Sequence, residues 1–129
     1  MATIKSYSDF QQSKVLSKIL SDDSADMRYH TISQYNQYPC DEIVYTVEFG
    51  KASGKDIPCW SLAALLNILH NKAKDIPSLS GGGYKAGKYT SDWCLDYEFE
   101  NGDYKTTFAD NPVDACYEMI LKLHEKKIL

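Results

Sequence analysis

Arginine is almost missing from this 129-residue sequence: Arg28 is the only one, and the formal net charge is −4. Non-specific binding to nucleic acids depends on clustered lysine and arginine side chains. Arginine is also the side chain that binds a phosphate group through two parallel hydrogen bonds. We therefore expect no nucleic-acid partner.

Long apolar runs are missing too. No stretch approaches the roughly 20 apolar residues that a membrane-spanning helix needs, and the N-terminal sequence MATIKSYSDFQQ lacks the apolar centre of a signal peptide. These absences predict a cytoplasmic protein without a membrane partner. In the reducing cytoplasm we expect Cys40, Cys59, Cys94 and Cys116 to be free thiols rather than disulfides.

The cysteines and histidines do not show the paired spacing that zinc sites use, such as C-x-x-C or H-x-x-H. His30, Cys40 and Asp41 could converge, but three suitable residues are expected by chance in a chain of this length. We predict neither a metal nor a cofactor. Asp92, Asp96, Glu98 and Glu100 line the polar face of one predicted strand, where an outward, solvated face explains them without a catalytic role.

The composition, 43% hydrophobic and 25% charged, is typical of a globular domain, and the length predicts one domain over residues 1–129.

Three helices are expected. The capping-box pattern Ser8 to Gln11 starts the first, which runs to about Ser21; the second covers residues 59–71; the third follows Asn111 as N-cap, with Pro112 in its first position.

Strands are predicted between these helices. Residues 27–38 are interpreted as a short strand running into a loop, residues 42–50 alternate as a half-buried strand, and residues 84–89 form a short strand. Asn101-Gly102 predicts a type I′ hairpin with a two-residue turn, which pairs Phe99 with Tyr104 and Leu95 with Phe108. The fold class is then α+β in the order α-β-β-α-β-β-β-α, an antiparallel sheet of four to five strands with three helices mainly on one face.

Cys59 lies in the stretch PCWSLAALL, at the expected start of the second helix, where some cysteine hydrolases hold their nucleophile. Such enzymes need a histidine base, usually from a downstream strand. Downstream of Cys59 the chain offers only His70 and His124, both expected on helices. A buried structural thiol is the preferred interpretation, and no catalytic residue is assigned.

Tyrosines gather in residues 29–38, among small polar residues. Tyrosine in such surroundings is typical of recognition surfaces, because it supplies contact area at a low entropic cost. The alternative is a loop folded onto the sheet with its tyrosines half buried. We predict that Tyr35 and Tyr38 contact a partner and that Tyr29 is packed inside.

Four stretches in this order carry a resemblance: residues 12–20, residues 24–29, residues 58–66 (PCWSLAALL) and residues 111–123 (NPVDACYEMILKL). Together they resemble an uncharacterised family of short proteins from gut Bacteroidales and from their phages and mobile elements. The resemblance implies a small intracellular accessory protein of phage-like origin and transfers no site residue.

From these observations we expect a non-enzymatic binding or interaction protein that associates with a protein partner. Association of two copies of the chain as a homodimer is also considered. The alternative is a small hydrolase with a cysteine nucleophile at Cys59. A pocket with convergent polar groups would favour the hydrolase, whereas an aromatic recognition surface would favour binding.

Overall fold

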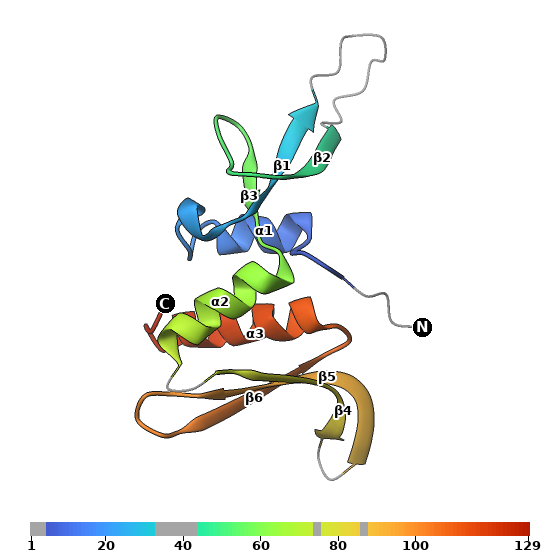
Figure 1. Cartoon of the computed structure of the whole chain (residues 1–129), viewed down its shortest axis with the longest axis vertical. Helices are drawn as coiled ribbons and strands as arrows, with labels where there is room; N and C mark the ends of the chain where they lie inside the picture. Colours follow the sequence, from blue (N-terminus) through green and yellow to red (C-terminus); the bar gives the residue numbers. More distant parts are fainter. Residues whose placement is uncertain (1–4, 33–43, 74–75, 86–87) are drawn as a thin grey trace. The chain divides into compact units, whose positions relative to one another are not determined.

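The computed structural model describes residues 5–32, 44–73, 76–85 and 88–129. In these residues the elements are α1 (Phe10–Leu16), the 3₁₀ turn η1 (Asp22–Ser24), β1 (Met27–Ile32), β2 (Val44–Phe49), β3 (Ile57–Cys59), α2 (Leu62–Lys72), β4 (Ser78–Lys85), β5 (Lys88–Glu98), β6 (Tyr104–Ala109) and α3 (Pro112–Glu125) (Figure 1). The α+β class is confirmed. The strands form two antiparallel sheets of three rather than one sheet of four or five, and a short unpredicted strand, β3, pairs with β1.

Contacts divide the chain into two compact units. The β1–β3 unit comprises Asp9–Trp60, and the β4–β6 unit comprises Met1–Ser8 with Ser61–Leu129. The single domain over residues 1–129 stays a prediction, because a unit of contacts need not fold by itself. Among the described residues, no helix is long and apolar enough to cross a membrane.

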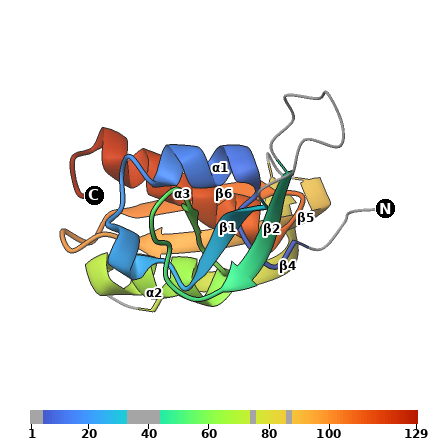
Figure 2. The same cartoon turned by 90° about the horizontal axis from the view of Figure 1, so that it is seen from above.

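In the β1–β3 unit, β1 is the central strand and pairs with β2 and β3 on its two sides. Figure 2 shows β1 and β2 side by side. Met27, Tyr29 and Cys59 are buried on one face of this sheet, and α1 packs there through Phe10. The Phe10 ring meets the Tyr29 ring edge-on, with centroids 5.5 Å apart. The prediction that Tyr29 is packed inside is therefore confirmed.

Helix α1 starts one residue later than predicted. Asp9 is the N-cap: its carboxylate accepts a hydrogen bond from the Gln12 amide at 2.8 Å, and the Gln12 side chain accepts one from the Asp9 amide at 3.0 Å. Ser8 is fully buried instead. The helix ends at Leu16 rather than near Ser21, and the Ser17 hydroxyl bonds the carbonyl of Lys14 at 2.8 Å. Serine competes for backbone groups in this way, which weakens a helix interior.

In the β4–β6 unit, β5 is the central strand, and α2 and α3 lie on one face of the sheet (Figure 1). Helix α2 packs against α3, and α3 packs against β5 and β6. The fully buried side chains of this core include Leu65, Leu69, Leu95, Tyr97, Met119, Ile120 and Leu123. Two of the three helices thus lie on one face of this sheet, whereas α1 belongs to the β1–β3 unit.

The predicted N-terminus of α3 is confirmed. The Asn111 side chain accepts a hydrogen bond from the Asp114 amide at 2.9 Å, and Pro112 occupies the first position of the helix. Asp114 in the first turn also pairs with Lys5 at 2.8 Å. A carboxylate at this end of a helix is favoured by the backbone dipole.

The hairpin at Asn101-Gly102 exists, but its predicted register is wrong by one residue. Tyr104 pairs with Glu98 and not with Phe99, and Phe108 pairs with Cys94. Because side chains alternate along a strand, this shift moves every β6 side chain to the other face. Thr107, opposite Leu95, is therefore buried, while Tyr104 is 71% exposed.

Candidate functional site

Cys59 is not at a helix N-terminus. It is the last residue of β3, opposite Met27 of β1, and its side chain is fully buried. Helix α2 starts later, at Leu62, after Ser61 as N-cap; the Ser61 hydroxyl accepts a hydrogen bond from the Ala64 amide at 3.1 Å. Strand pairing with β1 takes residues 57–59 into the sheet, where an edge strand tolerates Pro58. The predicted burial of the thiol is confirmed, and the predicted helical position is wrong.

Cys94 and Cys116, like Cys59, are thiols that form no disulfide. Burial raises the pKa of the Cys116 thiol to about 12. Burial, followed by the nearby Asp96 carboxylate, also raises the pKa of Cys94. A raised pKa lowers the fraction of reactive thiolate at neutral pH, so neither thiol is activated. Cys40 lies outside the described residues.

Tyr35 and Tyr38, the predicted partner contacts, also lie outside the described residues, and that prediction stays a prediction. Cys40 and Asp41 fall in the same undescribed stretch. His30, which was considered with them as a metal ligand, pairs with Asp56. Within the part of the chain that the structure describes, no three His, Cys, Asp or Glu side chains gather as a metal would require.

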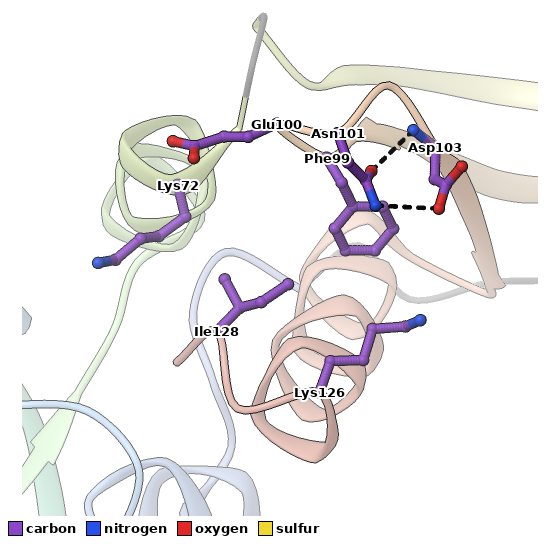
Figure 3. A pocket seen from close by; sticks show the side chains of 7 residues that line it. All are labelled: Lys72, Phe99, Glu100, Asn101, Asp103, Lys126 and Ile128. Atoms are coloured by element: carbon purple, nitrogen blue, oxygen red, sulfur yellow. Dashed lines mark hydrogen bonds between the residues drawn. The ribbon is translucent and has the colours of Figure 1, made fainter.

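The first candidate site is a cavity of about 490 Å³ in the β4–β6 unit, here called the hairpin pocket (Figure 3). Its lining comes from the end of α2, the β5–β6 turn and the residues that follow α3: Lys72, Phe99, Glu100, Asn101, Asp103, Lys126 and Ile128. This volume lies in the range of small-molecule and side-chain pockets, roughly 300–1,000 Å³. Sequence reasoning missed it because these residues are distant along the chain and share no motif.

The polar groups of the hairpin pocket do not converge on its interior. Asn101 and Asp103 bind each other: the Asn101 amide nitrogen donates to the Asp103 carboxylate at 3.1 Å, and the Asp103 backbone amide donates to the Asn101 side chain at 3.0 Å. In Figure 3 the amino groups of Lys72 and Lys126 point to opposite sides. The Lys126 ammonium lies 5.3 Å from the centre of the Phe99 ring.

Apolar surface remains at the centre of the hairpin pocket. Phe99 and Ile128 lie on facing sides of the space in Figure 3. Phe99 is only 8% exposed, and its ring packs edge-on against Tyr97 with centroids 5.2 Å apart, so one wall is rigid. A rigid apolar centre with a charged rim is the anatomy of a pocket that receives an apolar group.

The second candidate is a charged network on the face of the β1–β3 sheet opposite to α1. His30 Nδ1 lies 2.8 Å from Oδ1 of Asp56, whose side chain is 6% exposed. Oδ2 of Asp56 accepts the Ser53 amide at 3.1 Å and lies 3.8 Å from Nε of Arg28. Arg28 also donates to the Glu48 carboxylate, at 3.0 and 3.3 Å.

These contacts stabilise ionised carboxylates. The hydrogen bond from His30, followed by that from the Ser53 amide, holds the pKa of Asp56 below its ordinary value. The hydrogen bond from Arg28 holds the pKa of Glu48 below its ordinary value. An ionised carboxylate only accepts hydrogen bonds, so Nδ1 of His30 carries its proton. The network ties β1 to β2 and to the segment before β3, and this structural role accounts for its contacts.

Comparisons of the chain with protein-family models, with curated proteins and with solved structures found no match. The site must therefore be interpreted from its own geometry.

Proposed function

We propose that the chain is a non-enzymatic binding protein and that its hairpin pocket receives an apolar group of a protein partner. The arrangement of the pocket carries this proposal. Phe99 and Ile128 border its centre, whereas the side chains of Asn101 and Asp103 are hydrogen-bonded to each other. The amino groups of the two lysines point away from each other. Catalysis needs polar groups that converge on a reacting atom, whereas binding of an apolar group needs apolar walls.

The surroundings of the pocket support the same interpretation. The rim carries both lysine and acidic side chains, so it can pair with either sign of charge on a partner. The burial of the Cys59 thiol weighs against the alternative of a cysteine hydrolase. Intracellular location and phage or mobile-element origin are part of the proposal and rest on the sequence alone.

The pocket is tested with indole as a small apolar probe. Isoleucine methyl NMR signals of the native chain are followed during the titration. We expect the Ile128 signal to shift in a saturable manner and the signal of Ile57, which packs against the core of the β1–β3 unit, to stay in place. Equal movement of both signals, or none at Ile128, would overturn the proposed pocket.

Matched variants then link the pocket to a partner. Ile128→Glu places a charge at the apolar centre, and Phe49→Glu replaces a 79% exposed apolar side chain outside the pocket. A partner captured by the native chain is expected to be lost with Ile128→Glu and kept with Phe49→Glu, because truncating or charging an anchor residue typically costs about 2 kcal/mol or more. Retention by both variants would place the binding surface elsewhere.

The hydrolase alternative has its own measurement. Native protein is treated with a thiol reagent near pH 7, and the modified residues are identified by mass spectrometry. We expect Cys59 to react only when the chain unfolds, because its side chain is fully buried. Rapid reaction of Cys59 in the native state, with a midpoint well below the ordinary thiol pKa of about 8.5, would restore the hydrolase.

A further inference from the structure

Strand β2 is an edge strand: it pairs with β1 on one side, and within the described residues no strand lies on its other side (Figure 1). The Gly50 amide donates a hydrogen bond to the Asp26 carbonyl at 2.9 Å. Because bonded pairs recur at every second residue of an antiparallel ladder, Glu48 and Thr46 also direct their backbone groups towards β1. The alternate residues direct their N–H and C=O groups outwards and are here called the β2 edge: Tyr45, Val47 and Phe49.

The pairing of β1 with β3 agrees with this assignment. Pro58 of β3 lies opposite Arg28. Proline has no N–H to donate, so the hydrogen bonds between β1 and β3 come from the neighbouring pairs, and the backbone of Arg28 is directed towards β2. Arg28 lies opposite Glu48. Both ladders therefore direct the backbone of Glu48 towards β1 and that of its neighbours towards the open side.

The sequence of β2 does not block this edge. Natural sheets protect their edge strands with lysine, proline or a bulge, because open N–H and C=O groups attract another strand. Strand β2 (Val44–Phe49) contains neither lysine nor proline, and its register with β1 runs without a shift. The β2 edge is therefore suited to pair with a further strand.

The side chains of the β2 edge are apolar. They share the face on which α1 packs, and Tyr45 and Val47 pack against the core there. Phe49 differs from them, because it is 79% exposed although Met27, which lies opposite, is 5% exposed. The β2 edge thus combines outward backbone groups with an aromatic side chain that the described part of the chain leaves uncovered.

We propose that a second copy of the chain pairs with the β2 edge, antiparallel and about a two-fold axis at Val47. In this register Val47 lies opposite Val47 of the second copy, and Tyr45 lies opposite Phe49 of the second copy. Each outward residue then faces an outward residue, so every N–H and C=O group of the β2 edge gains a hydrogen bond. The same register covers the exposed Phe49 ring with an aromatic side chain, which is a favourable cross-strand pair.

Charge complementarity favours this register over its neighbours. Glu48 lies opposite Thr46 of the second copy; Arg28 already neutralises Glu48 at 3.0 Å, and the Thr46 hydroxyl is a donor that bonds Glu48 within the chain at 3.4 Å. Moving the two-fold axis to Glu48 would place this carboxylate opposite Glu48 of the second copy, where like charges repel. Moving the axis to Thr46 would place Phe49 beyond the end of the second β2 strand.

The size of the contact determines how strong the dimer is. A β2 strand of six residues is about 20 Å long. Two such edges bury less than the roughly 1,200 Å² of a standard protein–protein interface, so we expect a weak, concentration-dependent dimer. This inference goes beyond the proposed function and does not rest on the hairpin pocket.

Sedimentation velocity of the native chain between about 5 and 500 µM tests the dimer, since weak interfaces dissociate in this range. Phe49→Glu removes the aromatic pair and places a second carboxylate next to Glu48. Its matched control is Val15→Glu, which makes an apolar-to-acidic change at a 39% exposed position of α1 in the same unit.

We expect the native chain to approach the mass of a dimer at the highest concentration. Phe49→Glu is expected to raise the dissociation constant about tenfold or more, while Val15→Glu stays within about twofold of the native value. A native chain that stays monomeric over the whole range would overturn the proposal. Equal weakening by both variants would also overturn it, because only the added charge would then matter.

Cysteine cross-linking tests the register, and it decides the proposal if Phe49→Glu does not fold. Val47→Cys and Thr46→Cys are each made in a Cys40→Ser background, because Cys40 lies outside the described residues. The two copies of residue 47 form a hydrogen-bonded pair with Cα atoms about 5.5 Å apart, a distance that a disulfide spans. The two copies of residue 46 are offset along the strands and lie beyond that reach.

With oxidised glutathione as the oxidant, we expect a covalent dimer from Val47→Cys and none from Thr46→Cys. Equal yields from the two variants, or a covalent dimer from Thr46→Cys alone, would overturn the proposal.

The hairpin pocket and the β2 edge can fail independently. Ile128→Glu is expected to leave the dimer intact, and Phe49→Glu is expected to leave indole binding intact, because the two sites share no residue. A monomeric native chain that binds indole would overturn the β2 pairing alone. A dimer that binds no indole would support the β2 pairing and overturn the proposed pocket.

Discussion

The amide of Phe99 donates a hydrogen bond to the carbonyl oxygen of Asp103 at 2.8 Å, and this bond closes a loop of three residues, 100–102, between β5 and β6. Within this loop the Gly102 amide bonds the Phe99 carbonyl at 2.9 Å, and Gly102 has a φ of 93°. The loop ends on a left-handed bulge residue, and it is one residue longer than the two-residue turn that Asn-Gly favours. The extra residue produces the register of the hairpin.

Gly102→Val is expected to destabilise the chain by about 1–2 kcal/mol or more, because a β-branched residue rarely adopts a positive φ. A Cβ at this position would meet no atom within 4 Å, so the cost comes from the backbone alone. Urea unfolding measures the difference. Gly102→Asn serves as the control and should lose less, since asparagine tolerates this conformation; equal stability of the valine variant and the native chain would contradict the turn.

Thr107→Val tests the corrected register. The buried Thr107 hydroxyl donates a hydrogen bond to the Ala115 carbonyl at 2.8 Å and so joins β6 to α3. Valine keeps the shape but leaves the carbonyl without this donor, and we expect a loss of about 1 kcal/mol in the free energy of unfolding. In the register predicted from the sequence, Thr107 would lie on the sheet face opposite to α2 and α3, where the same substitution would cost almost nothing.

Tyr97→Phe is expected to have the opposite effect. The Tyr97 hydroxyl is buried and has no hydrogen-bond partner among the described residues. Burial, with a smaller effect of the Glu100 charge, raises its pKa to about 12. Removing a buried hydroxyl without a partner relieves a desolvation cost, so the variant should be as stable as the native chain or more stable by about 1 kcal/mol. A clear loss of stability in thermal unfolding would reveal a partner for this hydroxyl.

Asp56→Asn tests the charged network through pH. The folded-state pKa of Asp56 lies below the unfolded value, so its ionised form stabilises the fold fully above the unfolded pKa of about 3.9. That stabilisation disappears as the pH falls through the lower, folded-state pKa. The variant should be less stable than the native chain at pH 7, and the difference should shrink towards pH 3. A difference that stays constant over this range would mean that the charge of Asp56 does not contribute.

Lys127→Gly should stabilise the end of α3. Lys127 has a φ of 61°, and two hydrogen bonds close the helix around it: the Ile128 amide to the Leu123 carbonyl at 2.9 Å, and the Lys127 amide to the His124 carbonyl at 3.0 Å. This is a Schellman motif, in which glycine normally occupies the left-handed position. We expect a gain of about 1 kcal/mol. Lys126→Gly, one residue earlier with a negative φ, is the control and should not stabilise the chain.

Caps and alternating patterns in the sequence determined those helices and strands that are specified by residues close to one another along the chain. The Asn111 cap and Pro112 start α3 as predicted, and the alternation of residues 42–50 corresponds to β2. The alternation of β5 likewise separates buried Leu95 and Tyr97 from the partly exposed Asp96 and Glu98. A cap or an alternating pattern acts over one helical turn or one strand, so the sequence alone suffices for it.

The tertiary structure decided what depends on distant partners. Residues 57–59 become a strand only because β1 offers an open edge, and this pairing removes Cys59 from the helix start that its neighbours suggest. The strands likewise form two sheets rather than the single sheet expected from the element order. The His30–Asp56 pair joins residues 26 positions apart, and the hairpin pocket gathers residues from three separate segments of the chain. No local pattern encodes such contacts, because their free energy depends on which surfaces the folded chain brings together.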